Sequence, residues 1–338
     1  MRNLMDRIGY VPKTCVWEIT RACNLNCQHC GSAAGPKRHD ELTTDECLGL
    51  VKDLAELGCQ FITLSGGEPT VRSDWPQIAR AATDAGMAVN MVTNGMSNPH
   101  RLAQKATESG LTNIGVSIDG MHQTHDSIRA PGAFVRAVET VRVLAQTIWV
   151  DIMFTVNQKN LFEMEAVYLL AKELGARGFR VQLGKPMGNQ TFEEEFSLEP
   201  KHLLTLMPLL GKLARSRGPF VNVGDSIGYF SPEERLLRGH TSSMGHWTGC
   251  YAGCRGIGIQ SDGGIKGCLS LQPREGEPDI FVEGNIRDSS LREIWFRPGA
   301  FAYNRCHTQS NLKGACARCD YGEMCRGGAS CVAHTYTG

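Results

Sequence analysis

The chain has 338 residues, enough for one large domain and a smaller one, and its 35 basic residues balance its 35 acidic residues. This balance, without a long charge run, gives no support for binding to nucleic acid or to a membrane surface. The first residues lack the apolar core of a signal peptide, and no stretch approaches the roughly 20 apolar residues that span a bilayer. Fourteen cysteines in such a chain favour metal ligation in the reducing cytoplasm over disulfides.

Short apolar runs alternate with helical patterns in the first part of the chain. The runs predict six strands, at Val16–Thr20, Phe61–Ser65, Ala88–Thr93, Asn113–Ile118, Val150–Val156 and Phe179–Leu183. Helices are predicted from a capping-box pattern at Thr43, from about Asp74, Pro99, Ala133 and Leu161, and at Pro200–Arg217. Such strand–helix units favour parallel strands with right-handed crossovers, so we expect an α/β partial barrel with functional residues at the carboxyl ends of its strands.

The composition changes near Gly245, where the chain becomes rich in glycine and cysteine and loses its helical patterns. This change predicts a second, cysteine-rich domain. We expect a core at residues 1–215, a bridging region at 216–245 and the cysteine-rich domain at 246–338.

Cys23, Cys27 and Cys30 lie directly after the first predicted strand. An iron–sulfur cube normally takes four cysteine thiolates, so three close cysteines leave one iron open to a cofactor or substrate. A zinc site is the alternative, although zinc favours four ligands in paired knuckles. The spacing resembles the Cys-x3-Cys-x2-Cys signature of the radical S-adenosylmethionine (SAM) superfamily.

This resemblance implies a partial (β/α)6 radical SAM barrel and a 4Fe-4S cluster whose open iron chelates SAM. An electron, delivered by a donor such as flavodoxin or ferredoxin, then cleaves SAM to methionine and a 5′-deoxyadenosyl radical. The radical abstracts hydrogen from the substrate. A further interpretation is an iron–sulfur electron carrier without SAM chemistry. Such a carrier would need neither six strand–helix units nor the motif that follows the second strand, so it leaves both features unexplained.

That motif is Gly66-Gly67-Glu68-Pro69, in which glycines permit close backbone approach to a ligand and a carboxylate can accept from an ammonium group. It resembles the superfamily's GGEP motif, which holds the SAM amino group. Other polar residues fall near later strand ends, where a parallel sheet presents ligand contacts. The further candidates for the SAM site are His29, Thr93, Asn94, Ser117, Asp119, Arg129, Asn157, Gln182 and Leu183.

Several of these candidates have alternative roles. Arg129 either pairs with the SAM carboxylate or forms a surface ion pair with Asp126. His29, between two of the triad cysteines, is expected to pack on the adenine. An ordinary loop or core role is an equal alternative for the candidates at the last two strands, Asn157, Gln182 and Leu183.

A second set of cysteines lies in the C-terminal segment: Cys250, Cys254, Cys268, Cys316, Cys319, Cys325 and Cys331. Their spacing resembles the SPASM extension of radical SAM enzymes, which implies one or two auxiliary 4Fe-4S clusters. One cluster would use Cys250, Cys254, Cys268 and Cys331. The other would use Cys316, Cys319 and Cys325, completed by Cys306, by a ligand missing from this sequence or by none, which leaves an iron open. A zinc ribbon on Cys316–Cys331 is the alternative.

The sequence specifies the type of reaction more closely than it specifies the substrate. SPASM proteins often modify peptides, so the resemblance favours oxidation or crosslinking of a ribosomally made peptide. The cysteine triad begins at residue 23, so we expect any leader-peptide recognition to come from a separate protein. The alternative substrate is a small molecule (a sugar, an aminocyclitol or a porphyrin) that is dehydrogenated, epimerised or decarboxylated.

Asp225 and Tyr229 are the candidate catalytic residues. They lie in the predicted bridging region, and a junction between domains is a common place for a substrate pocket. A tyrosine can relay a radical or donate a proton. The alternative is a packed linker in which the aspartate caps a turn.

Overall fold

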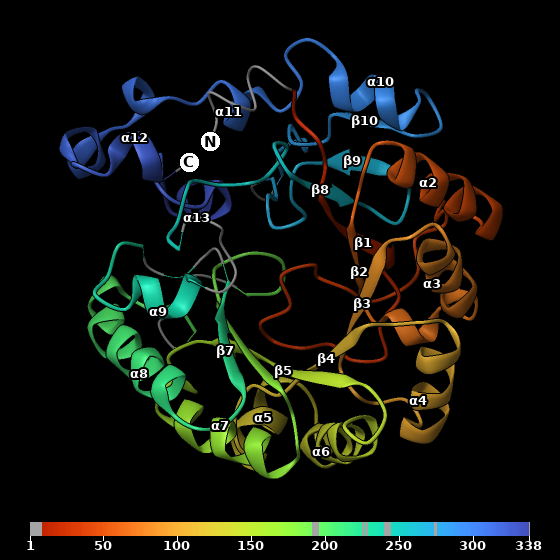
Figure 1. The fold of residues 1–338 in the computed structure, drawn as a ribbon, viewed down its shortest axis with the longest axis vertical. Helices are drawn as coiled ribbons and strands as arrows, with labels where there is room; N and C mark the ends of the chain where they lie inside the picture. The colour runs from red at the N-terminus through yellow and green to blue at the C-terminus, as the bar shows by residue number, and fades with distance from the viewer. Residues whose placement is uncertain are drawn as a thin grey trace.

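The computed structural model describes residues 9–190, 196–224, 227, 229–239, 245–273 and 276–337. Asp225, one of the two candidate catalytic residues, lies outside these ranges. Ten strands of the described chain form one sheet in the order β10-β9-β8-β1-β2-β3-β4-β5-β6-β7 (Figure 1). The strands are β1 (Thr14–Thr20), β2 (Phe61–Gly66), β3 (Ala88–Thr93), β4 (Asn113–Ser117), β5 (Trp149–Val156), β6 (Gly178–Leu183), β7 (Phe220–Val223), β8 (Gly256–Ile259), β9 (Gly264–Lys266) and β10 (Gly284–Asn285).

Neighbouring strands from β8 through β1 to β7 are parallel, whereas β9 and β10 run antiparallel to their neighbours. The six predicted strands are all present as β1 to β6, and the predicted α/β partial barrel is confirmed. Sequence reasoning missed β7, a run of four residues that is too short to show a clear alternating pattern. It also missed β8, whose sequence Gly-Ile-Gly-Ile alternates with glycine instead of a polar residue.

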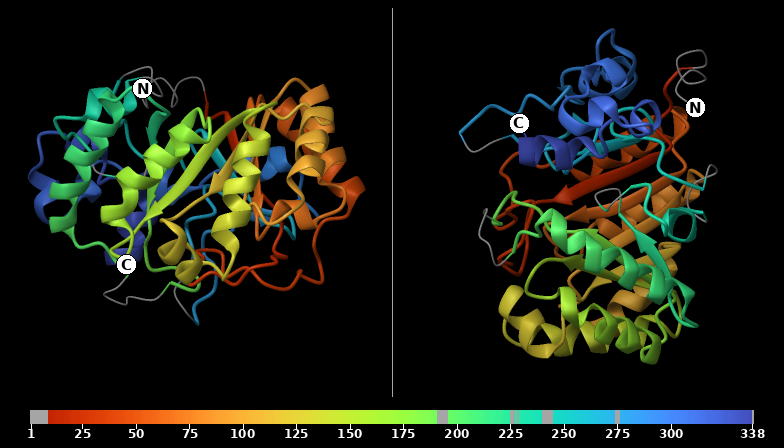
Figure 2. Two further views of the ribbon diagram at one scale, coloured as in Figure 1. Left: turned by 90° about the horizontal axis from the view of Figure 1, so that it is seen from below. Right: turned by 90° about the vertical axis from the view of Figure 1, so that its left-hand side faces the viewer.

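The helices form an outer arc around the curved sheet (Figures 1 and 2). They are α2 (Thr44–Glu56), α3 (Trp75–Asp84), α4 (Pro99–Glu108), α5 (His122–Ile128), α6 (Ala133–Leu144), α7 (Met164–Glu173), α8 (Leu203–Arg215), α9 (Glu234–Arg238), α10 (Leu291–Phe296), α11 (Ala302–Arg305), α12 (Gly322–Cys325) and α13 (Ser330–Thr337). Within the described ranges, no helix combines the length and apolar character that crossing a membrane requires.

The core lies between the sheet and these helices. β4 and β5 each bury apolar side chains completely, and Phe154 and Phe179 from neighbouring strands pack with ring centroids 5.7 Å apart. Tyr168 of α7 meets Phe179 edge-on at 5.6 Å. Because burying an aromatic side chain removes a large apolar area from water, these contacts hold the strands in register and fix where their carboxyl ends lie.

The cysteine-rich segment continues the barrel sheet. β8 pairs with β1 from Thr14 opposite Gly256 to Trp17 opposite Ile259. Trp295 and Phe301 join the same hydrophobic core as the barrel. The teal strand β8 lies beside the red strand β1 in Figures 1 and 2. The division at residues 215 and 245 stays a prediction, and β7, which pairs with β6, falls inside the predicted bridging region.

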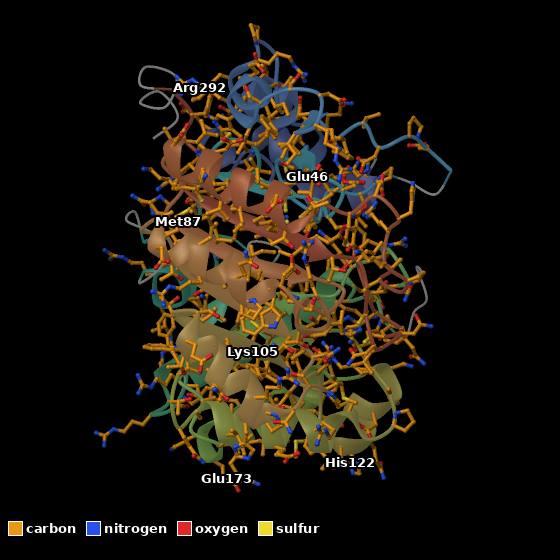
Figure 3. The ribbon with its side chains drawn as sticks, turned by 90° about the vertical axis from the view of Figure 1, so that its right-hand side faces the viewer. Glu46, Met87, Lys105, His122, Glu173 and Arg292 are labelled. Atoms are coloured by element: carbon orange, nitrogen blue, oxygen red, sulfur yellow. The ribbon has the colours of Figure 1, made fainter. Side chains whose placement is uncertain are left out.

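An ion pair ties α2 to the C-terminal segment. The Glu46 carboxylate, on α2 (Figure 3), accepts from Arg287 Nε at 2.6 Å and Nη2 at 2.9 Å. Glu46 also completes a capping box with Thr43 at the start of α2. The Arg287 guanidinium and the Thr43 amide lower the pKa of Glu46 to about 2.

Replacing Glu46 by glutamine should therefore destabilise the fold in a pH-dependent way. Because the pKa of Glu46 is lower in the folded state, its ionised carboxylate stabilises the fold above the ordinary glutamate pKa of about 4.5. This stabilisation is lost as the pH falls towards about 2. We expect E46Q to lower the urea midpoint at pH 7 and to approach the wild type below pH 4. The exposed Glu56, at the end of the same helix, provides the control E56Q, which should leave the midpoint nearly unchanged. An equal loss at pH 7 and pH 3 would contradict the assignment.

Candidate active site and iron–sulfur sites

The cysteine triad occupies a loop that begins where β1 ends. Cys23 N donates to Gly35 O at 2.9 Å and Cys30 N donates to Cys27 O at 3.2 Å, which folds the loop on itself. The three thiols lie within electrostatic range of one another. Burial raises the pKa of Cys27 to about 11, and Arg129 opposes that shift. Three clustered thiols suit a cluster that keeps one iron open.

Gly66 and Gly67 end β2 against the backbone that leads into the triad. Gly66 has a φ of 144°, which favours glycine, and a Cβ on it would lie 2.2 Å from Thr20 O. A Cβ on Gly67 would lie 2.3 Å from Ala22 O, while Gly67 N donates to Thr20 O at 2.9 Å. We expected these glycines to let a ligand approach the backbone closely. In the structure, they first of all let the end of β2 approach the backbone that leads into the cysteine loop. Pro69 follows in a short 3-10 turn.

Glu68 is buried and held by four donors. Its Oε1 accepts from Thr70 N at 3.1 Å, Thr70 Oγ1 at 2.7 Å and Thr93 Oγ1 at 2.8 Å, and its Oε2 accepts from Asn94 N at 2.7 Å. Burial raises the pKa of Glu68, and these hydrogen bonds oppose the shift. Thr93 and Asn94 therefore orient the carboxylate. Oε2, which has one of these four donors, can accept a further hydrogen bond, for example from an ammonium group.

Asp119 is fully buried after β4 and joins several segments. Its Oδ2 accepts from Arg129 Nε and Nη2, both at 2.6 Å, and lies 3.0 Å from His29 Nε2. Its Oδ1 accepts from Thr155 N at 2.7 Å. Burial alone would raise the pKa of Asp119, but Arg129 and His29 hold it well below its usual range. The alternative partner of Arg129, Asp126, instead accepts from backbone amides at the start of α6.

Sequence reasoning missed two residues that support Asp119. Asn160 Nδ2 donates to Asp119 O at 2.8 Å and to Thr155 O at 2.9 Å. His125 Nδ1 accepts from Asp119 N at 3.0 Å, and burial together with Arg129 lowers the pKa of His125 to about 4. Both residues act through the backbone of Asp119, for which a single sequence has no local signal.

The remaining strand-end candidates have mixed surroundings. Ser117 is buried at the end of β4. Asn157 is fully buried and turns back on its own loop, where its Oδ1 accepts from Lys159 N at 2.9 Å. Gln182 Nε2 donates to Thr155 Oγ1 at 3.0 Å, and Leu183 packs against the core. For Asn157 the local contacts match the alternative of a loop role.

The loop after β6 connects the two cysteine regions. Asn189 N donates to Cys30 O at 2.8 Å, and Asn189 Nδ2 donates to Cys27 O at 3.0 Å. Lys185, in the same loop, is buried, and its Nζ donates to Ser270 O at 3.4 Å. The Lys185 ammonium is also within electrostatic range of Cys268. This loop therefore lies against the triad and reaches the second set of cysteines.

Three cysteines of the C-terminal segment pack around one small apolar cluster, and Asn304 links a fourth to it. Cys250, Cys268 and Cys331 pack against Ala252, Leu271 and Phe281. Burial raises the pKa of Cys250 to about 12, and a hydrogen bond from Ser330 opposes the shift. Cys254 is buried beside them and accepts from Asn304 Nδ2 at 3.7 Å. The structure thus brings together the four cysteines that we predicted as one ligand set, although their role as ligands stays a prediction.

The other three cysteines form a separate group. Cys316 and Cys319 are exposed in and after a 3-10 turn at Gly314–Arg318, and both interact electrostatically with Cys325 at the end of α12. Cys306, the candidate fourth ligand, is exposed after α11. Across the described residues, no three His, Cys, Asp or Glu side chains converge closely enough to hold a single metal ion.

Tyr229 is anchored by packing. Its ring stacks on Trp247 with centroids 4.6 Å apart, and its hydroxyl accepts from Ala329 N at 2.9 Å. A Cβ on Gly328 would lie 2.6 Å from the same ring. These contacts tie the bridging region to the loop between Cys325 and α13 and match the alternative of a packed linker. Catalysis by Tyr229 stays a prediction.

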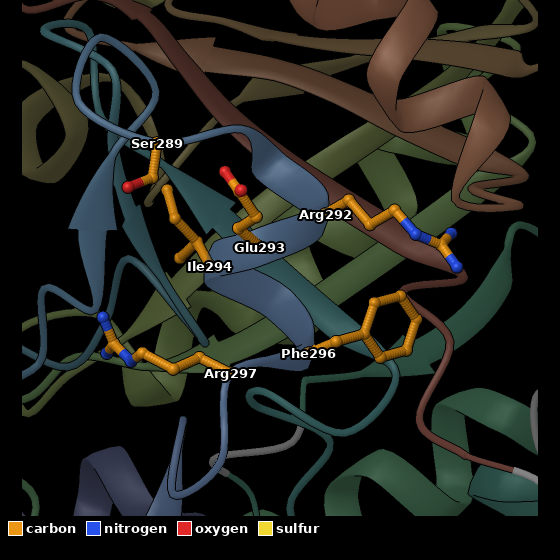
Figure 4. Close-up of a pocket in the computed structure, with 6 residues that line it drawn as sticks. All are labelled: Ser289, Arg292, Glu293, Ile294, Phe296 and Arg297. Atoms are coloured by element: carbon orange, nitrogen blue, oxygen red, sulfur yellow. The ribbon is translucent and has the colours of Figure 1, made fainter.

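A surface pocket of about 460 Å³ lies along α10 (Figure 4). All of its lining residues come from one helix and its flanks, so polar groups of other elements do not converge there as in a typical ligand site. None of the predicted site residues is among them: the lining is Ser289, Arg292, Glu293, Ile294, Phe296 and Arg297.

Replacing Asp119 by asparagine should destabilise the protein strongly. The change leaves the buried Arg129 guanidinium without its carboxylate, which typically costs about 3–5 kcal/mol. The matched control is D84N, because Asp84 pairs with Arg80 in an exposed helix and that pair is worth less than about 1 kcal/mol. Urea denaturation of both variants measures the difference. Equal losses in the two variants would show that Asp119 does not hold the site together.

Replacing Gly67 by alanine should disturb the cysteine loop. The new Cβ would overlap two backbone oxygens, Arg21 O and Ala22 O, which cannot rotate away. We expect a loss of at least about 1–3 kcal/mol in stability and a lower iron content after anaerobic reconstitution. The control is G49A in α2, where a Cβ meets nothing within 4 Å and alanine should stabilise the helix slightly. Full iron content in G67A would contradict the prediction.

Two family models match the chain. One, described as the radical SAM superfamily, matches residues 17–171, and one described as the SPASM iron–sulfur cluster-binding domain matches residues 250–320. An AdoMet-dependent heme synthase of Methanosarcina barkeri is 32% identical over 96% of this chain and 92% of its own length. A mycofactocin maturase, MftC, of Mycobacterium tuberculosis is 28% identical over 97% of this chain and 80% of its own length.

Solved structures share the fold at low sequence identity. Streptococcus suis SuiB bound to S-adenosylmethionine has a TM-score of 0.77 at 14% identity and covers 99% of this chain and 77% of its own. Native anSMEcpe with bound AdoMet has a TM-score of 0.72 at 16% identity and covers 94% and 89%. The chain belongs to the radical SAM superfamily: it is an enzyme that uses SAM with a 4Fe-4S cluster, and its C-terminal SPASM domain binds additional iron–sulfur clusters.

Proposed function

We propose that this enzyme oxidises or crosslinks a ribosomally made peptide in the cytoplasm. The observation that carries the proposal is the loop after β6, which contacts Cys27 and Cys30 through Asn189 and reaches Ser270, near Cys268, through Lys185. A substrate near this loop would lie between the SAM site and an auxiliary site. The SPASM domain and the likeness to mycofactocin maturase support a peptide as that substrate.

The SAM site is proposed to use the residues that the structure gathers beside the triad. Cys23, Cys27 and Cys30 would hold the cluster, and Glu68 Oε2 would accept from the SAM ammonium group. When bound, the cluster and SAM supply a 5′-deoxyadenosyl radical that removes hydrogen from the substrate. Asp119 fixes the direction of the Arg129 guanidinium, which lies within electrostatic range of Cys27 and Cys30 in the cysteine loop.

The auxiliary sites are proposed to follow the two cysteine groups. Cys250, Cys254, Cys268 and Cys331 would hold one 4Fe-4S cluster with full thiolate ligation. The more exposed group, Cys316, Cys319 and Cys325, would hold a second cluster, with its fourth position open or filled by Cys306. Flavodoxin or ferredoxin would supply electrons, and a separate protein would present the leader of the peptide.

A second candidate function is the modification of a small molecule such as a porphyrin. The observation that favours it is the 32% identity to an AdoMet-dependent heme synthase across nearly the whole chain. A porphyrin carries propionate side chains, and removal of carbon dioxide from one of them would be the decarboxylation considered above.

The test is a parallel assay on anaerobically reconstituted enzyme with dithionite and SAM. One arm receives the peptide encoded by the nearest small open reading frame, and the other receives iron coproporphyrin III. We expect 5′-deoxyadenosine to rise with the peptide and the peptide to lose two hydrogens by mass spectrometry. The variant C27A should abolish 5′-deoxyadenosine because it removes a proposed ligand of the SAM cluster. The matched control C47A removes a fully buried helix cysteine and should retain activity.

The outcomes separate the two candidate functions. A peptide of unchanged mass, with carbon dioxide lost from the porphyrin, would overturn the peptide proposal in favour of the second candidate. Retention of 5′-deoxyadenosine formation in C27A would overturn the proposed ligand set of the SAM cluster.

A further inference from the structure

The hydroxyl of Tyr303 is a buried donor without a hydrogen-bond partner in the described chain. Tyr303 belongs to α11, and its ring meets Phe281 edge-on with centroids 5.5 Å apart. Leaving a buried hydroxyl unpaired costs about 1–3 kcal/mol, so a folded protein normally provides it with an acceptor. Because the described residues provide none here, the acceptor is expected to belong to a bound group.

The hydroxyl lies where two of the cysteine-bearing segments meet. A Cβ built on Gly267 would lie 2.1 Å from Tyr303 Oη and 2.6 Å from Gly253 N, so the hydroxyl is close to both backbones. Gly267 precedes Cys268, and Gly253 precedes Cys254. The Tyr303 hydroxyl is also within electrostatic range of the sulfurs of Cys250, Cys254 and Cys268.

Neighbours in α11 fix the position of this tyrosine. Arg305 Nε donates to Gly253 O at 2.6 Å, and its Nη1 donates to Trp295 O at 2.8 Å. Asn304 Nδ2 donates to Cys250 O at 2.9 Å and to Ala252 O at 2.7 Å. These bonds hold α11 on the loop that carries Cys250 and Cys254. The direction of the Tyr303 hydroxyl is therefore set by the backbone around the cysteines.

A second observation is a buried positive charge, Lys185, within electrostatic range of Cys268. Lys185 is 7% exposed, and its one hydrogen bond in the described chain is the 3.4 Å contact with Ser270 O. No described carboxylate forms an ion pair with it, although a buried ammonium needs a counter-charge. Cys268 lies within electrostatic range of Lys185. Cysteine thiolates around an iron–sulfur cluster would supply the missing negative charge.

We infer that Tyr303 donates a hydrogen bond to a sulfur of the iron–sulfur cluster at Cys250, Cys254, Cys268 and Cys331, and so raises the reduction potential of that cluster. The inference rests on the ligand set given under the proposed function and is independent of the substrate. Hydrogen bonds to cluster sulfurs are one of the means by which a protein sets such potentials. Reduction adds one negative charge, and a donor stabilises the reduced form more than the oxidised form.

The experiment uses the full chain with Cys23, Cys27 and Cys30 replaced by alanine, so that only the auxiliary clusters contribute to the signal. Potentiometric titration followed by electron paramagnetic resonance gives their midpoint potentials. We expect Y303F to move one auxiliary midpoint to a more negative potential without loss of iron. It should also remove an exchangeable proton coupling from the pulsed spectrum of that cluster. The control is Y251F, because Tyr251 follows Cys250 but its hydroxyl pairs with Thr248 Oγ1 at 2.9 Å.

A second substitution guards against a variant that does not assemble. Incorporation of 3-fluorotyrosine at position 303 keeps the ring and makes the hydroxyl a stronger donor, so the same midpoint should move to a more positive potential. Unchanged midpoints in Y303F with full iron content would overturn the hydrogen bond, as would no shift with 3-fluorotyrosine. If C268A in the same background kept all of its iron, the ligand set would fail and the inference with it. An unchanged midpoint potential alone would overturn the hydrogen bond but would not contradict the ligand set.

Discussion

The close backbone contact between the end of β2 and the end of β1 is the constraint on which the proposed SAM site depends. Gly67 and Glu68 donate to Thr20 O and Ala22 O, and neither oxygen leaves space for a side chain on the glycines. The contact places the start of the cysteine loop beside the segment that carries the Glu68 carboxylate. Parallel pairing of β2 with β3 then brings Thr93 and Asn94 to that carboxylate. A cofactor that binds both a cluster and a carboxylate needs this fixed separation, because misplacement of about 1 Å weakens such sites.

Asp119 extends the same arrangement to the other side of the cysteine loop. Its carboxylate is bonded to His29 within the triad loop, to Arg129 after α5 and to the β5 backbone at Thr155. A buried charge of this kind is stabilising only when its partners are complete. The site is thus supported by polar bonds between loops, while the strands beneath are held by apolar packing. This division suits a site that must bind a charged cofactor on a rigid scaffold.

The sequence analysis was most successful where local pattern and chemistry coincide. The six strands of the barrel, the cysteine triad after β1 and the motif after β2 all have short signals that do not depend on distant residues. Asp119 and Arg129 were each predicted as site residues, but their ion pair was not. That pair depends on how α5 folds back over the sheet. Asn160, Lys185 and Tyr303 were missed for a similar reason, since they act across long sequence separations through loop backbones. β8 was missed because a glycine-rich strand is specified by its neighbour β1 more than by its own residues.

The pairing of β1 with β8 has a consequence for synthesis of the chain. Thr14 and Arg255, joined by a hydrogen bond beside this pairing, are 241 positions apart in the sequence. Until the later segment emerges from the ribosome, β1 presents an open edge of unpaired amides and carbonyls, and that strand leads into the cysteine triad. Contacts of such long range form late and slowly. The barrel and the cysteine-rich segment therefore complete each other, and the nascent enzyme passes through a stage in which its cysteine-triad loop is joined to an unpaired strand edge.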